Sequence, residues 1–356
     1  MKILTVIGAR PQFIKASVIS RALSSMHSNV QEVLVHTGQH YDANMSDVFF
    51  TELGIPCPTH NLGIGGGTHG ENTGRMLEKL EALMLLERPD RVLVYGDTDS
   101  TLAGSLAASK LHIPVAHVEA GLRSFNRKMP EEINRVLTDH LSSLLFAPTD
   151  RACSNLIKEG VAKEAIHRTG DVMYDVALLF KEHAKKPDWF DQAELRKDAF
   201  ALCTIHRAEN TDSPQNLKEI LKGLDSENVK FVLPLHPRTR LKLQKIGAPL
   251  PSNVHVTEPV GYLEMMWLEA NSKFIVTDSG GVQKEAYFHR KFCITLREET
   301  EWMELVEHQV NTLVGADSKR ISDAIDGDTS FQSDAELYGD GLSAVRISKI
   351  LTGDFL

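Results

Sequence analysis

Three acidic residues in the first half of the chain have a spacing typical of proton-transfer groups. Asp97 follows the apolar run 91–95, Glu119 follows the run 115–118, and Glu131 opens a helix-like segment. If the two runs are neighbouring parallel strands, Asp97 and Glu119 lie at the same edge of the sheet. Crowded carboxylates raise the pKa of at least one of them, which produces a usable acid or base. The pattern predicts an enzyme that moves protons at carbon.

The third carboxylate has a second interpretation that the sequence leaves open. Glu131 and Glu132 follow Pro130, a residue that suits the first position of a helix. A negative charge in the first helical turn is favoured by the helix dipole, so the two residues fit helix capping as well as catalysis.

The segment 8–15 comes directly after the first apolar run and has the composition of an anion-binding turn. It contains Arg10 and Lys15, and a helix beginning there presents free N–H groups. The alternative is an ordinary turn between a strand and a helix with two solvated cations, since this segment has no GxGxxG or GxxxxGK pattern.

A second turn of this kind lies in the other half of the chain, at 277–285. Gly280 and Gly281 let the backbone approach a ligand closely, and Ser279 offers a hydroxyl group. Glu285 lies about one helical turn further, within reach of ribose hydroxyls. Its alternative is a carboxylate on the helix surface.

Two further strands end in basic residues. His206 and Arg207 follow the run 200–204, and His236 follows the next strand. Histidine transfers protons near neutral pH and neutralises phosphates, although a histidine after a strand is often structural. No HExxH motif is present, so we expect no metal site.

Composition limits the class of protein. The chain has 356 residues, enough for two domains, and a formal net charge of −9, which argues against a nucleic-acid surface. None of its four cysteines forms a CxxC pair, and no apolar run approaches the length of a membrane span. Residues 1–7 read as a strand and not as a signal peptide, so we expect a cytoplasmic protein.

The order of elements predicts an α/β fold of two doubly wound, Rossmann-like domains with an interdomain cleft. Short β-branched runs alternate with amphipathic helical segments, and the alternation restarts after the polar stretch 181–189. We expect an N-terminal domain at 1–175, which carries the carboxylates, and a nucleotide-binding domain at 176–356. The last helix, 342–351, could pack on either domain.

Seven blocks of sequence resemble the non-hydrolysing UDP-N-acetylglucosamine 2-epimerases. They are GARPQFIKA (8–16), HTGQHYD (36–42), GDTDSTLAG (96–104), HVEAGLRS (117–124), PEEINR (130–135), HRAEN (206–210) and TDSGGVQKEA (277–286). They occur in the order of the family along nearly the whole chain, which is far more specific than any single block.

The resemblance implies a fold of the glycosyltransferase-B type, with UDP bound mainly by the C-terminal domain. Family enzymes remove the C2 proton and expel UDP from C1, which gives a 2-acetamidoglucal intermediate. UDP then adds back while a proton returns to the opposite face of C2. The resemblance implies no nicotinamide or other cofactor, a homodimer, and a place in supplying precursors of bacterial surface polysaccharides such as lipopolysaccharide.

The resemblance also assigns roles to residues. Asp97, Glu119 and Glu131 match the acid/base carboxylates, with the face of C2 that each serves left open. Further residues match the groups that bind UDP in the family. Arg10, Lys15 and His206 match groups that hold the diphosphate, and Ser279, Gly280 and Gly281 match the phosphate-binding turn. Glu285 matches the ribose ligand, and Arg297 matches a basic residue near the nucleotide.

Two departures from the family pattern concern the substrate and regulation. Many members have Arg-Pro-Glu after a Thr-Glu pair, whereas this chain has Trp-Met-Glu after that pair, in the segment 300–304. This variant, with the segments 42–45 and 66–70, resembles the branch acting on UDP-2,3-diacetamido-2,3-dideoxyglucuronate. That substrate needs an extra cation, and the candidates are Arg123, Arg127 and Lys128.

A site for a second, activating UDP-N-acetylglucosamine is only partly matched. Gln39, Arg75 and His236 match its residues, but Asp42 stands at the second glutamine position. The segment 300–304 therefore favours the diacetamido-uronate as substrate, with UDP-N-acetylglucosamine as the alternative, and activation by a second UDP-sugar stays open.

Other classes of function remain as alternatives. They are a glycosyltransferase of the same fold, a nucleotide-sugar sensor without turnover, and an epimerase that hydrolyses its product. Three carboxylates suit proton traffic at C2 better than glycosyl transfer, which needs one principal base.

Overall fold

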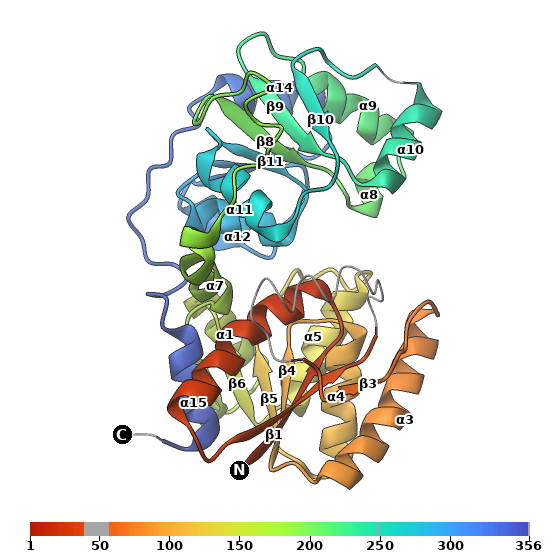
Figure 1. The fold of residues 1–356 in the computed structure, drawn as a ribbon, viewed down its shortest axis with the longest axis vertical. Coiled ribbons are helices and arrows are strands. Elements are labelled where there is room, and N and C mark those ends of the chain that lie inside the picture. The colour runs from red at the N-terminus through yellow and green to blue at the C-terminus, as the bar shows by residue number, and fades with distance from the viewer. Residues whose placement is uncertain (39–56, 248, 355–356) are drawn as a thin grey trace. The chain divides into compact units, whose positions relative to one another are not determined.

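The computed structural model describes residues 1–38, 57–247 and 249–354, and its chain divides into two compact units (Figure 1). Unit 1 comprises Met1–Leu178 and Glu336–Leu356, and unit 2 comprises Leu179–Ala335. Each unit contains one parallel sheet with helices on both faces, so the predicted α/β class with two doubly wound sheets is confirmed.

The sheet of unit 1 has the strand order β3-β2-β1-β4-β5-β6-β7. Its strands are β1 (Lys2–Ile7), β2 (Gln31–His36), β3 (His60–Asn61), β4 (Arg91–Tyr95), β5 (Val115–Val118), β6 (Leu144–Ala147) and β7 (Ile166–Arg168). Its helices are α1 (Arg10–Met26), α3 (His69–Glu87), α4 (Asp99–Lys110), α5 (Pro130–Leu141), α6 (Asp150–Lys158), α7 (Val172–Phe180) and α15 (Ser343–Thr352), of which α7 continues past the division.

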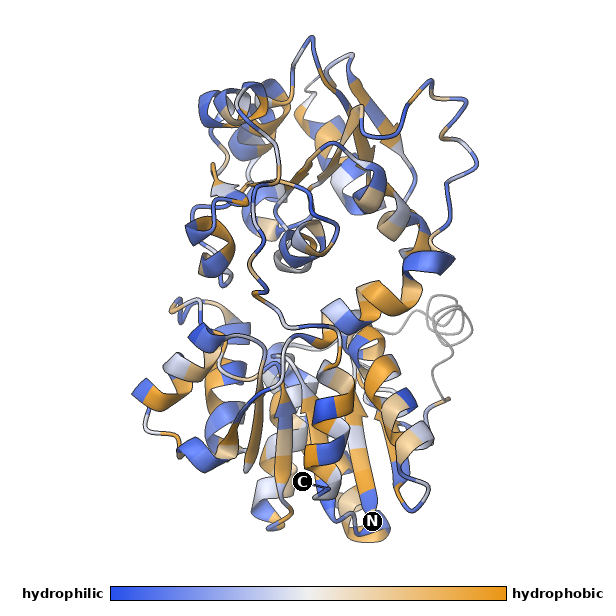
Figure 2. Ribbon diagram, turned by 90° about the vertical axis from the view of Figure 1, so that its left-hand side faces the viewer, coloured by the Kyte–Doolittle hydropathy of each residue, from blue (hydrophilic) through white to orange (hydrophobic). Residues whose placement is uncertain are grey.

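The order of strands reverses at β1, which pairs in parallel with both β2 and β4. Ligands of doubly wound sheets bind at such a reversal, outside the carboxyl ends of the strands. The strands of this sheet are covered on both faces and are therefore apolar. In β1, for example, Ile3, Leu4, Val6 and Ile7 are wholly buried. Figure 2 shows hydrophobic residues along the strands and mixed colours on the helices.

The C-terminal segment belongs to unit 1, where α15 packs against α1. Asp175 accepts hydrogen bonds from the backbone N–H groups of Ser343 (3.2 Å) and Ala344 (2.7 Å) at the start of α15. A carboxylate there satisfies N–H groups that have no partner within the helix. The sequence predicts a domain boundary after residue 175 and leaves open which domain the last helix packs on. In the structure, Asp175 binds the start of this helix, which belongs to unit 1.

The sheet of unit 2 has the strand order β10-β9-β8-β11-β12-β13. Its strands are β8 (Phe200–Thr204), β9 (Lys230–Pro234), β10 (Val254–Thr257), β11 (Ile275–Thr277), β12 (Cys293–Thr295) and β13 (Asn311–Leu313). Its α-helices are α8 (Ala208–Thr211), α9 (Pro214–Gly223), α10 (Pro237–Ile246), α11 (Tyr262–Asn271), α12 (Gly280–Phe288), α13 (Met303–Glu307) and α14 (Ser318–Asp326).

The reversal in unit 2 lies between β8 and β11, which pair in parallel. The turns after these two strands contain His206 and Ser279, so the fold brings together two predicted ligand-binding turns. In the described part of the chain, no helix is both long and apolar enough to cross a membrane.

Candidate active site

Asp97 and Glu119 lie at the same edge of the unit 1 sheet. The strands before them, β4 and β5, are neighbours, as predicted, with Tyr95 opposite Val118. The N–H of Gly96 donates to the carbonyl of Val118 at 3.0 Å, so the pairing continues into the loops that hold both carboxylates.

Lys15 reaches the same edge from α1 and pairs with Glu119. Its ammonium group contacts the carboxylate of Glu119, and the two side chains are only 10% and 9% exposed. Gly96 lies beside them, since a methyl group there would be 3.4 Å from Oε2 of Glu119 and 3.6 Å from Nζ of Lys15. Burial strengthens this ion pair by excluding water.

The backbone of Glu119 lies in the left-handed region, with φ of 73°. For a residue other than glycine this conformation costs about 1–3 kcal/mol and persists only where the surroundings impose it. Here the N–H groups of Glu119 and Ala120 both donate to the carbonyl of Phe146 at 3.1 Å. Strained residues of this kind cluster at functional sites.

Asp97 is held by two residues of α5. Nη2 of Arg135 donates to its carboxylate at 2.5 Å, and Nδ2 of Asn134 donates to its backbone carbonyl at 3.0 Å. Burial raises the pKa of Asp97, and the charge of Glu119 adds to that rise, while Arg135 and Lys15 oppose it. With its side chain 31% exposed, Asp97 combines a raised pKa with access to a ligand, as an acid or base requires.

The two glutamates that open α5 differ in their surroundings. Glu131 is exposed in the first turn of the helix, whereas Glu132 is buried. The carboxylate of Glu132 accepts hydrogen bonds from the N–H and hydroxyl of Ser124, both at 2.9 Å, and from the N–H of Phe125 at 3.0 Å. The structural interpretation therefore applies to Glu132, which holds the backbone locally. Glu131 is the carboxylate that a ligand can reach.

Gln12 organises this edge, and sequence reasoning did not single it out. Its side-chain oxygen accepts from the N–H groups of Gly8 (2.7 Å) and Ala9 (2.9 Å), and its Nε2 donates to the carbonyl of Tyr95 at 2.7 Å. One amide therefore ties the turn after β1 to the turn after β4. A polar residue one turn into a helix, after Pro11, was the available signal.

Arg123 is turned into the interior of unit 1. Its guanidinium donates from Nε and Nη2 to both carboxylate oxygens of Glu159 at 2.8 and 2.6 Å, and Nη1 lies 2.7 Å from Asp139. Burial alone would lower the pKa of Arg123, but these two carboxylates raise it above its ordinary value. A sugar contact by Arg123 would require it to give up these partners, whereas Arg127 and Lys128 are exposed.

The remaining predicted residues of unit 1 are placed as follows. Arg10 begins α1, and its side chain lies outside the described part. Gln39 and Asp42 also lie outside the described residues. Arg75 is exposed on α3 and pairs with Glu71 at 3.1 Å.

In unit 2, Asp278 gathers the two predicted turns around one buried carboxylate. It accepts hydrogen bonds from the N–H groups of His206 (3.1 Å) and Arg207 (3.0 Å) and from the side chain of Asn210 (3.1 Å). Its Oδ1 also lies 3.1 Å from Nδ1 of His206, whose ring is 54% exposed. Burial opposes ionisation, but hydrogen bonds and the His206 charge lower the pKa of Asp278 below its ordinary value.

Ser279 is the N-cap of α12, and its hydroxyl accepts from the N–H of Val282 at 3.4 Å. The helix that begins at Gly280 directs the positive end of its dipole at this turn. A methyl group on Gly280 would come within 2.3 Å of Oε1 of Glu301, whereas at Gly281 its nearest neighbour is 3.8 Å away. An alanine at 280 would therefore require the carboxylate of Glu301 to move.

The variant segment 300–304 packs against α12 and Arg297. Glu301 pairs with Nη1 of Arg297 at 3.0 Å, and the Thr300 hydroxyl donates to the side chain of Gln283 at 2.7 Å. The ammonium group of Lys284 lies 4.2 Å from the ring centre of Trp302. The departure from the family pattern at Trp302 is thus matched by a cation–π contact within unit 2.

Glu285 faces a buried acid on the neighbouring helix α11. Burial raises the pKa of Glu269 far above its ordinary value, and the charge and hydrogen bond of Glu285 raise it further. Burial and the charge of Glu285 therefore both favour the protonated form of Glu269.

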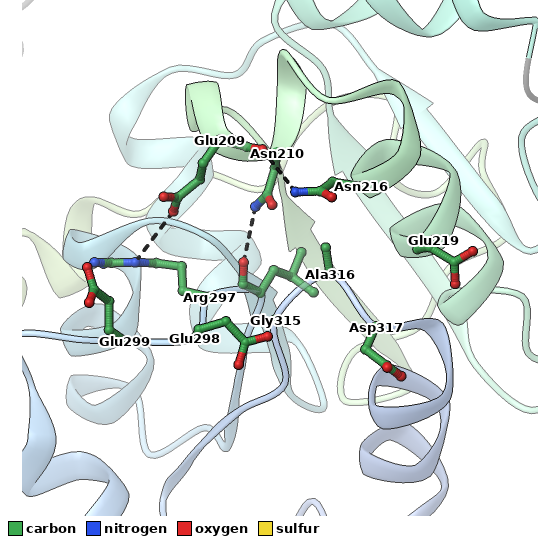
Figure 3. A pocket seen from close by; sticks show the side chains of 11 residues that line it. Glu209, Asn210, Asn216, Glu219, Arg297, Glu298, Glu299, Gly315, Ala316 and Asp317 are labelled. Carbon is green, nitrogen blue, oxygen red and sulfur yellow. Dashed lines mark hydrogen bonds and ion pairs between the residues drawn. The ribbon is translucent and has the colours of Figure 1, made fainter.

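Arg297 lines a cavity of about 520 Å³ in unit 2 (Figure 3). Nε of Arg297 lies 3.9 Å from a carboxylate oxygen of Glu209, and Asn210 donates to the carbonyl of Leu296 at 3.1 Å. The other lining residues are Asn216, Glu219, Glu298, Glu299, Gly315, Ala316 and Asp317. His236 lies elsewhere, at the N-cap of α10, where its Nδ1 accepts from the N–H of Arg238 at 3.3 Å.

Comparison with known proteins identifies the family of this chain. The family model described as UDP-N-acetylglucosamine 2-epimerase matches residues 22–352. The UDP-2,3-diacetamido-2,3-dideoxy-D-glucuronate 2-epimerase of Pseudomonas aeruginosa is 53% identical over 358 residues, covering 99% of each chain. The chain belongs to the UDP-N-acetylglucosamine 2-epimerase family.

Archaeal members of the family agree in sequence and in fold. The UDP-N-acetylglucosamine 2-epimerase of Methanocaldococcus jannaschii is 46% identical over 365 residues, covering 99% of each chain. A crystal structure of the M. jannaschii enzyme in complex with UDP-GlcNAc and UDP superposes with a TM-score of 0.89 at 44% identity, covering 99% of this chain and 100% of the other.

Family membership confirms several predictions. The chain is an isomerase of the UDP-sugar 2-epimerase class, and its two units have the glycosyltransferase-B type of fold. The alternative of a glycosyltransferase is not favoured by these relatives.

Proposed function

We propose that this epimerase acts on UDP-2,3-diacetamido-2,3-dideoxy-D-glucuronate and inverts the configuration at C2. The observation that supports this substrate is the sequence identity to two relatives. The chain is 53% identical along its length to the P. aeruginosa enzyme that acts on this UDP-sugar, and 46% identical to the UDP-N-acetylglucosamine enzyme of M. jannaschii. Exposed Arg127 and Lys128 support the choice, because a uronate carries a carboxylate that needs a cation.

The proposed reaction is an elimination of UDP followed by its re-addition. A base removes the proton from C2, and the electron pair of that C–H bond forms the C1–C2 double bond. UDP leaves C1 with the electron pair of the C1–O bond. It then returns to C1 while an acid delivers a proton to the other face of C2.

In unit 1, the proton-transfer groups of this proposal are Asp97, Glu119 and Glu131. The raised pKa of Asp97 suits a group that takes up and releases a proton. Lys15 forms an ion pair with Glu119 and places a positive charge beside the carboxylates. Glu131 is exposed at the start of α5 and is available to a ligand.

In unit 2, the proposal assigns the diphosphate to the turn around Asp278 and Ser279. His206, held by Asp278, stabilises the departing phosphate, and the N-terminus of α12 receives its charge. Glu285 accepts hydrogen bonds from the ribose hydroxyls, and Arg297 supplies a nearby cation. Arg10 and Arg207 complete the predicted basic groups. A homodimer, a cytoplasmic location and the absence of a cofactor are parts of the same proposal.

Deuterium incorporation tests the proposal. Purified enzyme is incubated in D₂O separately with the diacetamido-uronate substrate and with UDP-N-acetylglucosamine, and C2 is followed by proton NMR. We expect exchange at C2 and epimerisation with the uronate at a much higher kcat/KM. Exchange with UDP-N-acetylglucosamine alone would revise the substrate, and exchange with neither would overturn the proposal.

A further inference from the structure

His117, a buried residue of β5, uses both nitrogens of its ring. Its Nδ1 lies 2.7 Å from Oδ1 of Asp139, and its Nε2 lies 2.7 Å from the backbone carbonyl of Gly96. A carbonyl oxygen only accepts hydrogen bonds, so Nε2 carries a proton and donates it to Gly96. The side chains of His117 and Asp139 are both wholly buried.

Asp139 lies on α5 and is the acceptor at the other side of the ring. Burial alone would raise the pKa of Asp139, but His117 and then Arg123 lower it below its ordinary value. Nδ1 of His117 faces this carboxylate while Nε2 faces the carbonyl of Gly96, so the ring bridges two oxygen atoms on different elements. Arg123 extends the network, since its Nη1 lies 2.7 Å from Asp139 and its Nη2 lies 2.6 Å from Glu159.

This pair joins the two loops that hold the candidate proton-transfer carboxylates. Gly96, whose carbonyl accepts from His117, directly precedes Asp97. On the other side, Oδ2 of Asp139 accepts from the N–H of Gly121 at 3.1 Å, and Gly121 follows Glu119 by two positions.

Both loops contain residues with a left-handed backbone, and one of these residues, Glu119, is not a glycine. Gly96, Glu119 and Gly121 have positive φ of 63°, 73° and 82°. A methyl group on Gly121 would come within 2.4 Å of the carbonyl oxygen of Ala152, so this loop is also closely packed. Left-handed backbone at Glu119 persists only where neighbouring groups fix it.

We propose that His117 is a positioning residue that, through Gly96 and Asp139, sets the separation of Asp97 and Glu119. It acts through the backbone on both sides and touches no substrate. The proposal rests on the proposed roles of those two carboxylates in proton transfer. Displacing a reacting group by about 1 Å lowers a rate roughly 100-fold, so a buried bridge of this kind has a measurable effect on turnover.

Two amide substitutions separate the two hydrogen bonds of the ring. In His117→Gln the amide nitrogen takes the place of Nε2 and keeps the bond to Gly96. In His117→Asn it takes the place of Nδ1, so the bond to Asp139 is kept and the bond to Gly96 is lost. The two variants have the same functional group, so a difference between them shows which of the two hydrogen bonds, to Gly96 or to Asp139, contributes more to turnover.

We expect kcat to fall roughly 100-fold in His117→Asn and much less in His117→Gln, with KM and the Kd for UDP nearly unchanged in both. The ratio of C2 exchange to net epimerisation in D₂O should also change in His117→Asn, because one carboxylate is displaced from the other. Asp175→Asn is the matched control, since Asp175 is a buried carboxylate that holds backbone N–H groups of α15 in unit 1. It should lower the Tm and leave kcat and the ratio unchanged.

Equal loss of kcat in the two His117 variants, or loss that follows Tm as in the Asp175 control, would overturn the positioning role. The wild-type enzyme separates this outcome from failure of the proposed function. If wild type exchanges no deuterium at C2 with either UDP-sugar, the proton-transfer roles themselves are wrong and the positioning role is overturned with them.

Discussion

The ammonium group of Lys15 lies against the carboxylate of Glu119, a residue whose own backbone is strained at φ of 73°. The Lys15–Glu119 pair is largely buried. Gly96, which directly precedes Asp97, lies beside this pair and has no side chain. One cation thus acts on two carboxylates, because Lys15 also opposes the rise in the pKa of Asp97. The charge of Lys15 favours the ionised form of Asp97, whereas burial favours its protonated form.

Glu119→Gln should reduce turnover with little effect on nucleotide binding. The amide keeps the shape of the side chain and cannot take up a proton, so we expect kcat to fall about 10²–10⁴-fold. The Kd for UDP, measured by calorimetry, should stay within about threefold, since a proton-transfer group contributes to the transition state and not to ground-state binding. A large loss of UDP affinity with near-normal kcat would assign Glu119 to binding.

The pH dependence of kcat/KM should report Asp97. Burial and the charge of Glu119 raise its pKa, so its ionised form appears only at a pH above the ordinary value of about 4. If Asp97 acts as the base, kcat/KM falls as the pH is lowered through this raised value. In Asp97→Asn, the residual activity should lack that acid limb. An unchanged limb in the variant would show that another group titrates there.

Asp278→Asn should destabilise unit 2 at neutral pH, because the buried carboxylate accepts several hydrogen bonds at once. We expect a loss of about 1–3 kcal/mol in the free energy of unfolding, measured with urea at pH 7. The pKa of Asp278 is lowered in the folded state. Its contribution is therefore present above the unfolded pKa and is lost as the pH falls through the folded pKa.

The difference in stability between wild type and Asp278→Asn should accordingly shrink on acidification. Ser279→Ala is a suitable control, since it removes an N-cap worth about 1 kcal/mol and no titrating group. A constant difference for Asp278→Asn down to low pH would contradict the assigned charge.

Gly280→Ala and Gly281→Ala should differ although the two residues are adjacent. The first substitution forces Glu301 away and weakens its ion pair with Arg297, which we expect to cost about 1–3 kcal/mol by overpacking. The second has room and should be neutral or stabilising by about 0.5–1 kcal/mol, because alanine favours helices. Thermal unfolding without nucleotide measures both, and equal Tm values would refute the packing argument.

The elements that the sequence predicted best are those with long apolar runs. β1, β4, β5 and β8 are buried on both faces, so their boundaries follow from composition alone. β7 (Ile-His-Arg) and β13 (Asn-Thr-Leu) have three residues each and escaped prediction, because neither is an apolar run; each is paired in parallel with one neighbour, β6 and β12.

Long-range contacts explain what sequence reasoning missed in the candidate site. In the sequence Arg123 reads as a free cation beside a turn, yet Asp139 and Glu159, on other elements, hold its guanidinium in the interior. The sequence also could not distinguish Glu131 from Glu132. That distinction depends on the path of the loop at Ser124, whose N–H and hydroxyl bind only the second of them.

The central claim is that C2 is inverted by loss and return of a proton while UDP leaves and re-adds. The most direct measurement is proton NMR of the product formed from UDP-2,3-diacetamido-2,3-dideoxy-D-glucuronate by wild-type enzyme in D₂O. The account predicts that every product molecule carries deuterium at C2. Product that retains its original hydrogen at C2 would contradict it.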